Sequence, residues 1–259
     1  MTGASSMVLL PYCLRLLWQR RSAALLALLL PLMAWVLPLL TPWQTQGALL
    51  QPTRMQTAWL LLWLALALFF ILQAAAMGRD LRTQGLLEHV AASRHPLRQA
   101  LLPVVLALGL WLNIALLLVL LLGWQLRPAM AVEAGLWGQL LLQQALLIEL
   151  VALGLLSLAT ALATRFSQAV ATLICLSLLA CGWMLGSWLE QWTADNLPGM
   201  LSWLRLLLPR QDLADLNPRF IFKLGPLPTT TFLRVLGISG LQALALILIS
   251  RKLCRCHTR

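Results

Sequence analysis

Residues 101–123 read LLPVVLALGLWLNIALLLVLLLG, a run in which Asn113 is the only polar side chain. A helix rises about 1.5 Å per residue, and about 20 predominantly apolar residues are needed to cross the hydrocarbon core of a bilayer. This stretch is therefore long enough and apolar enough to form one membrane-spanning helix.

The rest of the chain repeats this pattern. Its residues are 61% hydrophobic and 10% charged, whereas soluble domains average about 25% charged residues. The apolar runs are rich in leucine, alanine and tryptophan and lack the ten-residue alternation of barrel strands, which favours helices. We therefore predict an all-α, polytopic membrane protein, one transmembrane domain over residues 1–259, with six transmembrane helices at about 22–41, 57–77, 101–124, 138–163, 169–189 and 232–250.

Two segments outside these spans have a distinct character. In residues 9–21, leucines alternate with Arg15, Gln19 and further arginines, which predicts an N-terminal interfacial helix. Met200–Leu208 is an apolar run of nine residues, too short to cross a bilayer, so we expect it to be re-entrant or interfacial. Prolines 209, 218, 226 and 228 should then keep the chain extended up to the last span.

The basic residues predict the orientation. With both termini in the cytoplasm, twelve of the nineteen lysines and arginines fall on the inner side and seven on the outer side, and cytoplasmic segments are the ones that carry this excess. The net charge of +11 then reflects orientation, and we expect the lipid bilayer rather than nucleic acid as the partner.

No sequence motif for a catalytic site is present. The chain has no G-x-x-x-x-G-K-[ST], no H-E-x-x-H and no G-x-S-x-G, so we expect no enzymatic activity of its own. Cys254, Cys256 and His257 have ligand types that suit copper or zinc, but three groups at a chain end make an incomplete site. The expectation is a reduced tail without a metal.

Glu149 is the one acidic residue deep in a predicted span. A charge at mid-bilayer costs roughly 3 kcal/mol on insertion scales, so this side chain should face the bundle interior or be protonated. It is a candidate pathway residue, with a helix-packing role as the alternative.

Residues 78–99, GRDLRTQGLLEHVAASRHPLRQ, form a polar island with four arginines between two spans. Gly85 can serve as N-cap of a short helix, and Glu88 can reach back to the first turn. Because His95 precedes Pro96, that helix should end near Ser93. It would present Leu86, Leu87 and Val90 on one side, a surface that can insert into a groove on a partner protein.

The island, with Asp80, Gly85-Leu86-Leu87-Glu88, Ser93 and then Pro96-Leu97, resembles the loop after the second span in permeases of the type-2 ABC transporter family. Leu86 stands where threonine is common, the acidic residue is one position further from the glycine, and Arg94-His95 separates Ser93 from Pro96. The resemblance implies that the short helix is a cytoplasmic coupling helix that docks on an ATPase. The candidate coupling residues are Asp80, Arg82, Gly85, Leu86, Leu87, Glu88, Val90, Ser93 and Pro96.

The resemblance further implies the membrane subunit of an ATP-driven ABC exporter in a bacterial inner membrane. A separate ABC ATPase subunit would bind ATP and Mg²⁺, and a second permease subunit, identical or different, would complete the pathway. Two alternatives stay open: a proton-coupled secondary transporter that uses Glu149, and a non-transporting membrane assembly or maturation factor. The sequence does not distinguish among cargo classes.

Overall fold

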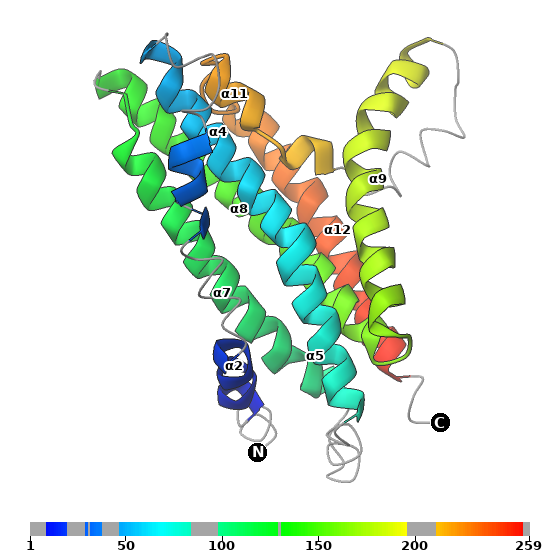
Figure 1. The fold of residues 1–259 in the computed structure, drawn as a ribbon. Helices are drawn as coiled ribbons and strands as arrows, with labels where there is room; N and C mark the ends of the chain where they lie inside the picture. The colour runs from blue at the N-terminus through cyan, green and yellow to red at the C-terminus, as the bar shows by residue number, and fades with distance from the viewer. Residues whose placement is uncertain are drawn as a thin grey trace.

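A computed structural model of the chain describes residues 9–19, 29–30, 32–37, 47–83, 98–128, 131–195 and 211–255 (Figure 1). Within these ranges every element is helical, so the predicted all-α class is confirmed for the described part. The elements in chain order are α2 (Leu9–Gln19), α4 (Gly47–Ala65), η3 (Leu66–Phe70), α5 (Ile71–Thr83), α7 (Arg98–Gln125), α8 (Ala131–Ala163), α9 (Gln168–Asp195), η4 (Gln211–Ala214), α11 (Asn217–Ile221) and α12 (Thr229–Arg255).

Among the described residues, four stretches of helix are long and apolar enough to cross a membrane, namely Leu50–Thr83, Leu101–Gln125, Glu133–Ala163 and Thr229–Cys254. A shorter apolar stretch, Gln168–Met184, lies within α9. The first predicted span, 22–41, falls largely outside the described residues. The described part of the chain is thus all-helical, and its four candidate spans indicate a multi-pass membrane protein, whereas the count of six stays a prediction.

The second span differs from its prediction at both ends. Residues 47–56, expected to connect the first two spans, are helical, and Pro52 is the sixth residue of α4, where it removes one i→i−4 backbone hydrogen bond. The helix continues through a π-helical stretch, η3, into α5 and ends at Thr83. The first residues of the expected 78–99 loop, including Asp80 and Arg82, are therefore helical.

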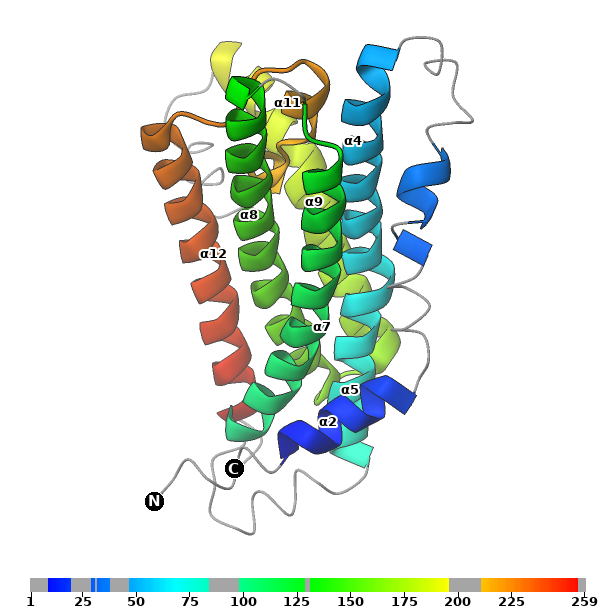
Figure 2. The same cartoon turned by 90° about the vertical axis from the view of Figure 1, so that its left-hand side faces the viewer.

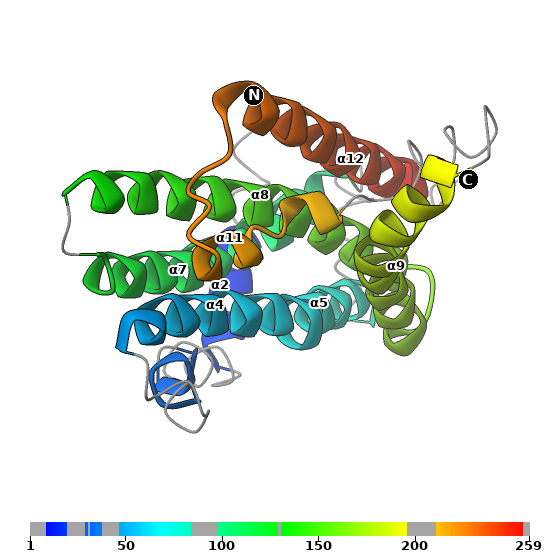
Figure 3. The same ribbon diagram turned by 90° about the horizontal axis from the view of Figure 1, so that it is seen from above.

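Helix α8 is the central element, because it contacts α5, α7, α9 and α12 (Figure 3). Small residues let its neighbours approach closely, as is common between membrane helices. A Cβ atom added to Gly78 of α5 would lie 2.3 Å from the backbone oxygen of Thr160 in α8. One added to Gly154 of α8 would lie 3.1 Å from the Cα of Ala243 in α12.

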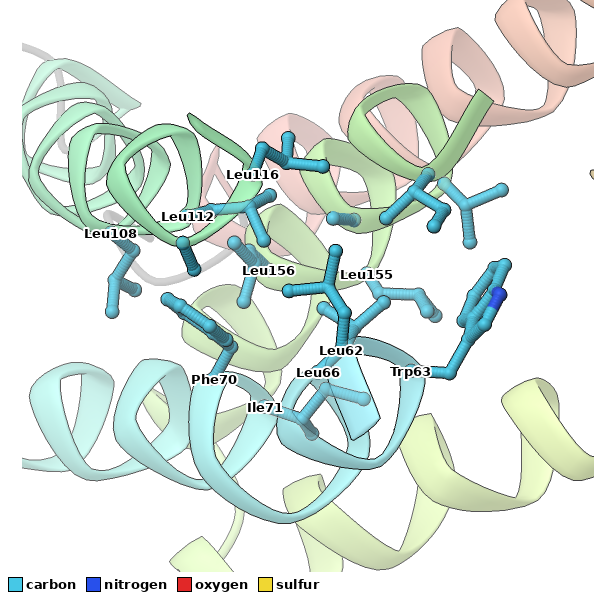
Figure 4. Packing of buried hydrophobic residues seen from close by; sticks show 14 of the residues in the cluster. Leu62, Trp63, Leu66, Phe70, Ile71, Leu108, Leu112, Leu116, Leu155 and Leu156 are labelled. Carbon is cyan, nitrogen blue, oxygen red and sulfur yellow. The ribbon is translucent and has the colours of Figure 1, made fainter. Parts of the chain in front are cut away.

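The core fills the space between the α4–α5 rod, α7 and α8 (Figure 4). The rod, which is the continuous helix α4–η3–α5, contributes Leu62, Leu66, Phe70 and Ile71. Helix α7 contributes Leu108, Leu112 and Leu116, and α8 contributes Leu155 and Leu156. These side chains are almost fully buried, so the three elements form one packed unit.

Helix α2 lies across the lower ends of α5 and α7 (Figure 2). Its Cys13 and Leu17 are buried, whereas Arg15 and Trp18 are exposed, and the Trp18 ring lies 5.7 Å from that of Trp111 in α7. Figure 1 places α2, the end of α5 and the C-terminal end of α12 at one end of the bundle, and α11 at the other. We call these the α2 end and the α11 end.

Candidate functional site

The α2 end holds the described part of the polar island. Arg79 donates two hydrogen bonds to Oδ1 of Asp80, at 3.3 Å from Nε and 3.1 Å from a terminal nitrogen. Arg82 donates to the backbone oxygen of Arg165 at 3.2 Å, across 83 residues of sequence. Together with the Gly78 contact, this bond ties the end of α5 to the turn between α8 and α9.

The predicted coupling residues are only partly described. Asp80 and Arg82 lie in the last turns of α5. The others, Gly85, Leu86, Leu87, Glu88, Val90, Ser93 and Pro96, lie in residues 84–97, outside the described residues. Their predicted roles therefore stay predictions.

A cleft of about 1080 Å³ opens at the α2 end between α5 and the α8–α9 turn. Three arginines line it: Arg79, Arg82 and Arg165. Thr83, Ser167 and Gln168 add polar groups, and no acidic residue is among its described lining residues. We call it the arginine cleft.

At the α11 end, residues 211–228 are held by two adjacent glutamines of α8. Gln143 donates to the backbone oxygen of Leu227 at 3.0 Å and accepts from its N–H at 2.8 Å. Gln144 donates to the oxygen of Ala214 at 3.1 Å and accepts from the N–H of Leu216 at 2.6 Å. Each side-chain amide thus satisfies backbone groups that have no helical partner, as buried irregular backbone requires.

An aromatic cluster also anchors this segment. Phe220 of α11 is buried, with ring centroids 5.1 Å from Trp137 and 6.5 Å from Trp59. Arg219 donates from Nε to the oxygen of Gly225 at 2.8 Å, which closes the following turn, where Gly225 has a positive φ of 68°. Residues 211–228 are therefore not extended throughout, since Pro218 stands in the first turn of α11.

Asp215 is the titratable group in this segment whose environment is unusual. Burial raises the pKa of its carboxyl above the ordinary value, opposed by the hydrogen bond that its Oδ1 accepts from the N–H of Asn217 at 3.1 Å. The raised pKa favours the protonated carboxyl in the folded state.

An apolar groove of about 640 Å³ runs between α4 and α9. Its walls include Leu60, Leu64 and Leu179, and the rings of Trp63 and Trp183 lie 5.8 Å apart at its side. The groove offers apolar surface with almost no polar groups.

Glu149 does not point into the centre of the bundle. Its side chain is partly exposed, and its Oε1 accepts a hydrogen bond from Asn113 of α7 at 3.1 Å. The Asn113 amide also donates to the backbone oxygen of Gly109 at 2.9 Å. The pair lies near the middle of two candidate spans and on their outer surface. Because polar groups in a membrane are costly to expose to lipid, a further helix would most readily cover this position.

No metal site forms among the described residues. Cys254 is buried near the end of α12, beside Thr164 and Arg165. Cys256 and His257 lie outside the described residues. No group of three or more metal-binding side chains occurs in the ranges that the structure describes.

Sequence reasoning missed two features of these ends. The backbone-binding role of Gln143 and Gln144 had one available signal, an adjacent pair of amides within an apolar run. The sequence signal for the arginine cleft was weaker, because it consisted of a single arginine in the short turn after Ala163. Comparison with known proteins adds no assignment, because no family model, no curated protein and no solved structure matches this chain.

Proposed function

We propose that the chain is the membrane-spanning permease subunit of an ATP-driven ABC exporter in a bacterial inner membrane. In this proposal both termini face the cytoplasm, so the α2 end is the inner end. Residues 84–97 dock on a separate ATPase subunit that binds ATP and Mg²⁺, with Leu86, Leu87 and Val90 in its groove and Gly85 and Glu88 at the helix start.

The observation that carries the proposal is the mechanical continuity between the polar island and the bundle. The island continues directly from the α4–α5 rod, which runs from Gly47 to Thr83 without a break. Close packing at Gly78 and the Arg82–Arg165 hydrogen bond couple the rod to α8 and to the start of α9. A displacement applied at residues 84–97 would therefore be transmitted through the rod to α8 and to the start of α9.

The apolar groove between α4 and α9 is the surface that such a movement would reshape. It lies on the wall between the rod and α9, so a change in their spacing changes its width. In the proposal this groove faces the translocation pathway, and a second permease subunit supplies the opposite wall. The leucine and tryptophan lining suits an amphiphilic cargo.

The experiment is purification of the tagged full chain from its native membranes in a mild detergent, with mass spectrometry and an ATPase assay on the eluate. The expected result is a stoichiometric nucleotide-binding subunit. Its recovery should fall with Leu87→Arg, whereas Glu88→Ala should retain the complex but uncouple ATP hydrolysis from transport. Glu133→Ala, an exposed carboxylate at the α11 end, is the matched control. An eluate without an ATPase, repeated from nanodiscs, would reject the proposal.

A second candidate function is a proton-coupled carrier, and the Asn113–Glu149 pair favours it. A partly exposed carboxyl near mid-membrane can exchange a proton if a water-filled path reaches it. This function predicts transport that follows the proton gradient and is lost in Glu149→Gln, with no ATPase in the eluate. Complex formation with neither flux nor an ATPase would instead indicate the assembly or maturation factor.

A further inference from the structure

The arginine cleft has positive charge at one end and apolar walls beyond it, an arrangement that parallels the headgroup and acyl chains of a lipid. Its charged end consists of Arg79 and Arg82 on α5 and Arg165 on the α8–α9 turn. Its walls continue as Leu72 on α5 and as Leu173 and Leu176 on α9. At about 1.5 Å per helical residue, Leu72 lies roughly 10 Å from Arg79 along the helix, toward the middle of the span.

Among the described residues, the positive charge of the cleft is only partly compensated. Asp80 pairs with Arg79. Arg82 uses one of its five N–H donors in the hydrogen bond to the Arg165 oxygen. Nε of Arg165 is buried and has no hydrogen-bond partner among the described residues. Arg82 and Arg165 line the cleft and form no ion pair with a described residue, so an anion in the cleft would form charge-assisted hydrogen bonds with their guanidinium groups.

The N-terminal end of α9 adds to the positive electrostatic potential of the cleft. Ser167, which lines the cleft, precedes the first helical residue, Gln168, and its Oγ accepts from the N–H of Val170 at 3.3 Å. The N-terminus of this 28-residue helix, with its partial positive charge, therefore also borders the cleft.

We propose that the arginine cleft binds one anionic phospholipid of the adjacent leaflet. The lipid phosphate lies against Arg82 and Arg165, and an acyl chain follows Leu72, Leu173 and Leu176. Charge complementarity selects an anionic headgroup, and the apolar continuation selects a lipid over a soluble phosphate. The volume of about 1080 Å³ slightly exceeds the ~300–1,000 Å³ of small-molecule pockets, which suits a headgroup with part of its chains. This inference does not depend on the ABC proposal.

The test is lipid binding to the purified full chain in neutral detergent, by native mass spectrometry and by the shift in thermal unfolding. Phosphatidylglycerol should be retained and should raise the unfolding temperature, whereas phosphatidylcholine with the same chains should do neither. Glycerophosphoglycerol, the headgroup without chains, and inorganic phosphate should not compete. Equal effects of phosphatidylcholine would overturn the proposal, and so would competition by either soluble phosphate.

Variants then locate the site. Arg82→Gln combined with Arg165→Gln should weaken phosphatidylglycerol binding about 25-fold, at roughly fivefold per arginine near an anionic surface. Arg251→Gln, an exposed arginine on α12 at the same end and outside the cleft lining, should bind as the wild type does. Unchanged binding in the double variant would overturn the proposal. The titration of the wild type decides the lipid class even if the double variant does not fold.

Discussion

The side chain of Gln143 and the backbone of Leu227 exchange two hydrogen bonds across 84 residues of sequence. Gln144, the next residue, binds the backbone of Ala214 and Leu216 in the same way. Two consecutive residues of one central helix therefore hold both ends of a segment in which two short helices, η4 and α11, are joined by irregular backbone.

Gln144→Leu should lower the free energy of unfolding, because it leaves the Ala214 oxygen and the Leu216 N–H buried without partners, at about 1–3 kcal/mol for each group. Equilibrium unfolding in detergent measures the loss, and tryptic cleavage after Arg219 reports release of the segment. Gln139→Leu is the control, since Gln139 is exposed on the same helix one turn earlier and should change stability by less than about 0.5 kcal/mol. Equal stability of both variants would contradict the role of Gln144.

Gly78→Ala should also destabilise the protein. The added methyl group would lie 2.3 Å from the backbone oxygen of Thr160, so α5 must move away from α8, at a cost of about 1–3 kcal/mol or more. Gly138→Ala is matched to it, because a Cβ there meets nothing within 4 Å and the change should stabilise the helix by roughly 0.5–1 kcal/mol. The two unfolding midpoints should shift in opposite directions, and a shared direction would count against the close helix crossing.

Phe220→Ala should cost about 3–5 kcal/mol, as expected for removing a buried aromatic ring. The ring fills the space between Trp59 and Trp137. Phe222 is 70% exposed two residues later, so Phe222→Ala should leave the unfolding midpoint nearly unchanged. Similar midpoints for the two variants would mean that α11 is not anchored through Phe220.

The Asp215 carboxyl should make stability fall as pH rises. Burial raises its pKa in the folded state, so the folded protein binds the proton more tightly than the unfolded chain does. The stabilisation is complete below the unfolded pKa of about 3.9 and is lost as pH rises through the folded pKa. Asp215→Asn should flatten this dependence and stabilise the protein at pH 8. Unfolding midpoints from pH 4 to 8 test it, and parallel curves would refute it.

Composition alone predicts the class of this fold, because runs such as residues 101–123 have no stable conformation in a bilayer except a helix. It does not predict where these helices begin and end. Helix α4 starts at Gly47 in a stretch that contains Arg54 and Pro52, residues whose polarity and missing N–H favour a loop. Packing of Met55, Ala58 and Trp59 into the core supplies the stabilisation that a sequence window does not contain.

Side-chain direction was less predictable still. Helices that are apolar on all sides carry little periodic signal, so the pattern around Glu149 does not indicate which way the carboxyl points. The structure places it on the bundle surface, beside Asn113 of the neighbouring helix. The glutamine and arginine contacts likewise join residues 70 to 84 positions apart, and such pairs are fixed by tertiary packing alone.

The glutamine pair on α8 also has a consequence for synthesis. Its backbone partners follow it by 70 to 84 residues, which at about 5–20 residues per second corresponds to roughly 4–17 s of translation. Throughout that interval the nascent chain holds two side-chain amides within a candidate span whose final backbone partners do not yet exist. A chain that stalls before residue 214 never acquires them, and quality-control proteases that survey the membrane would meet it in this incomplete state.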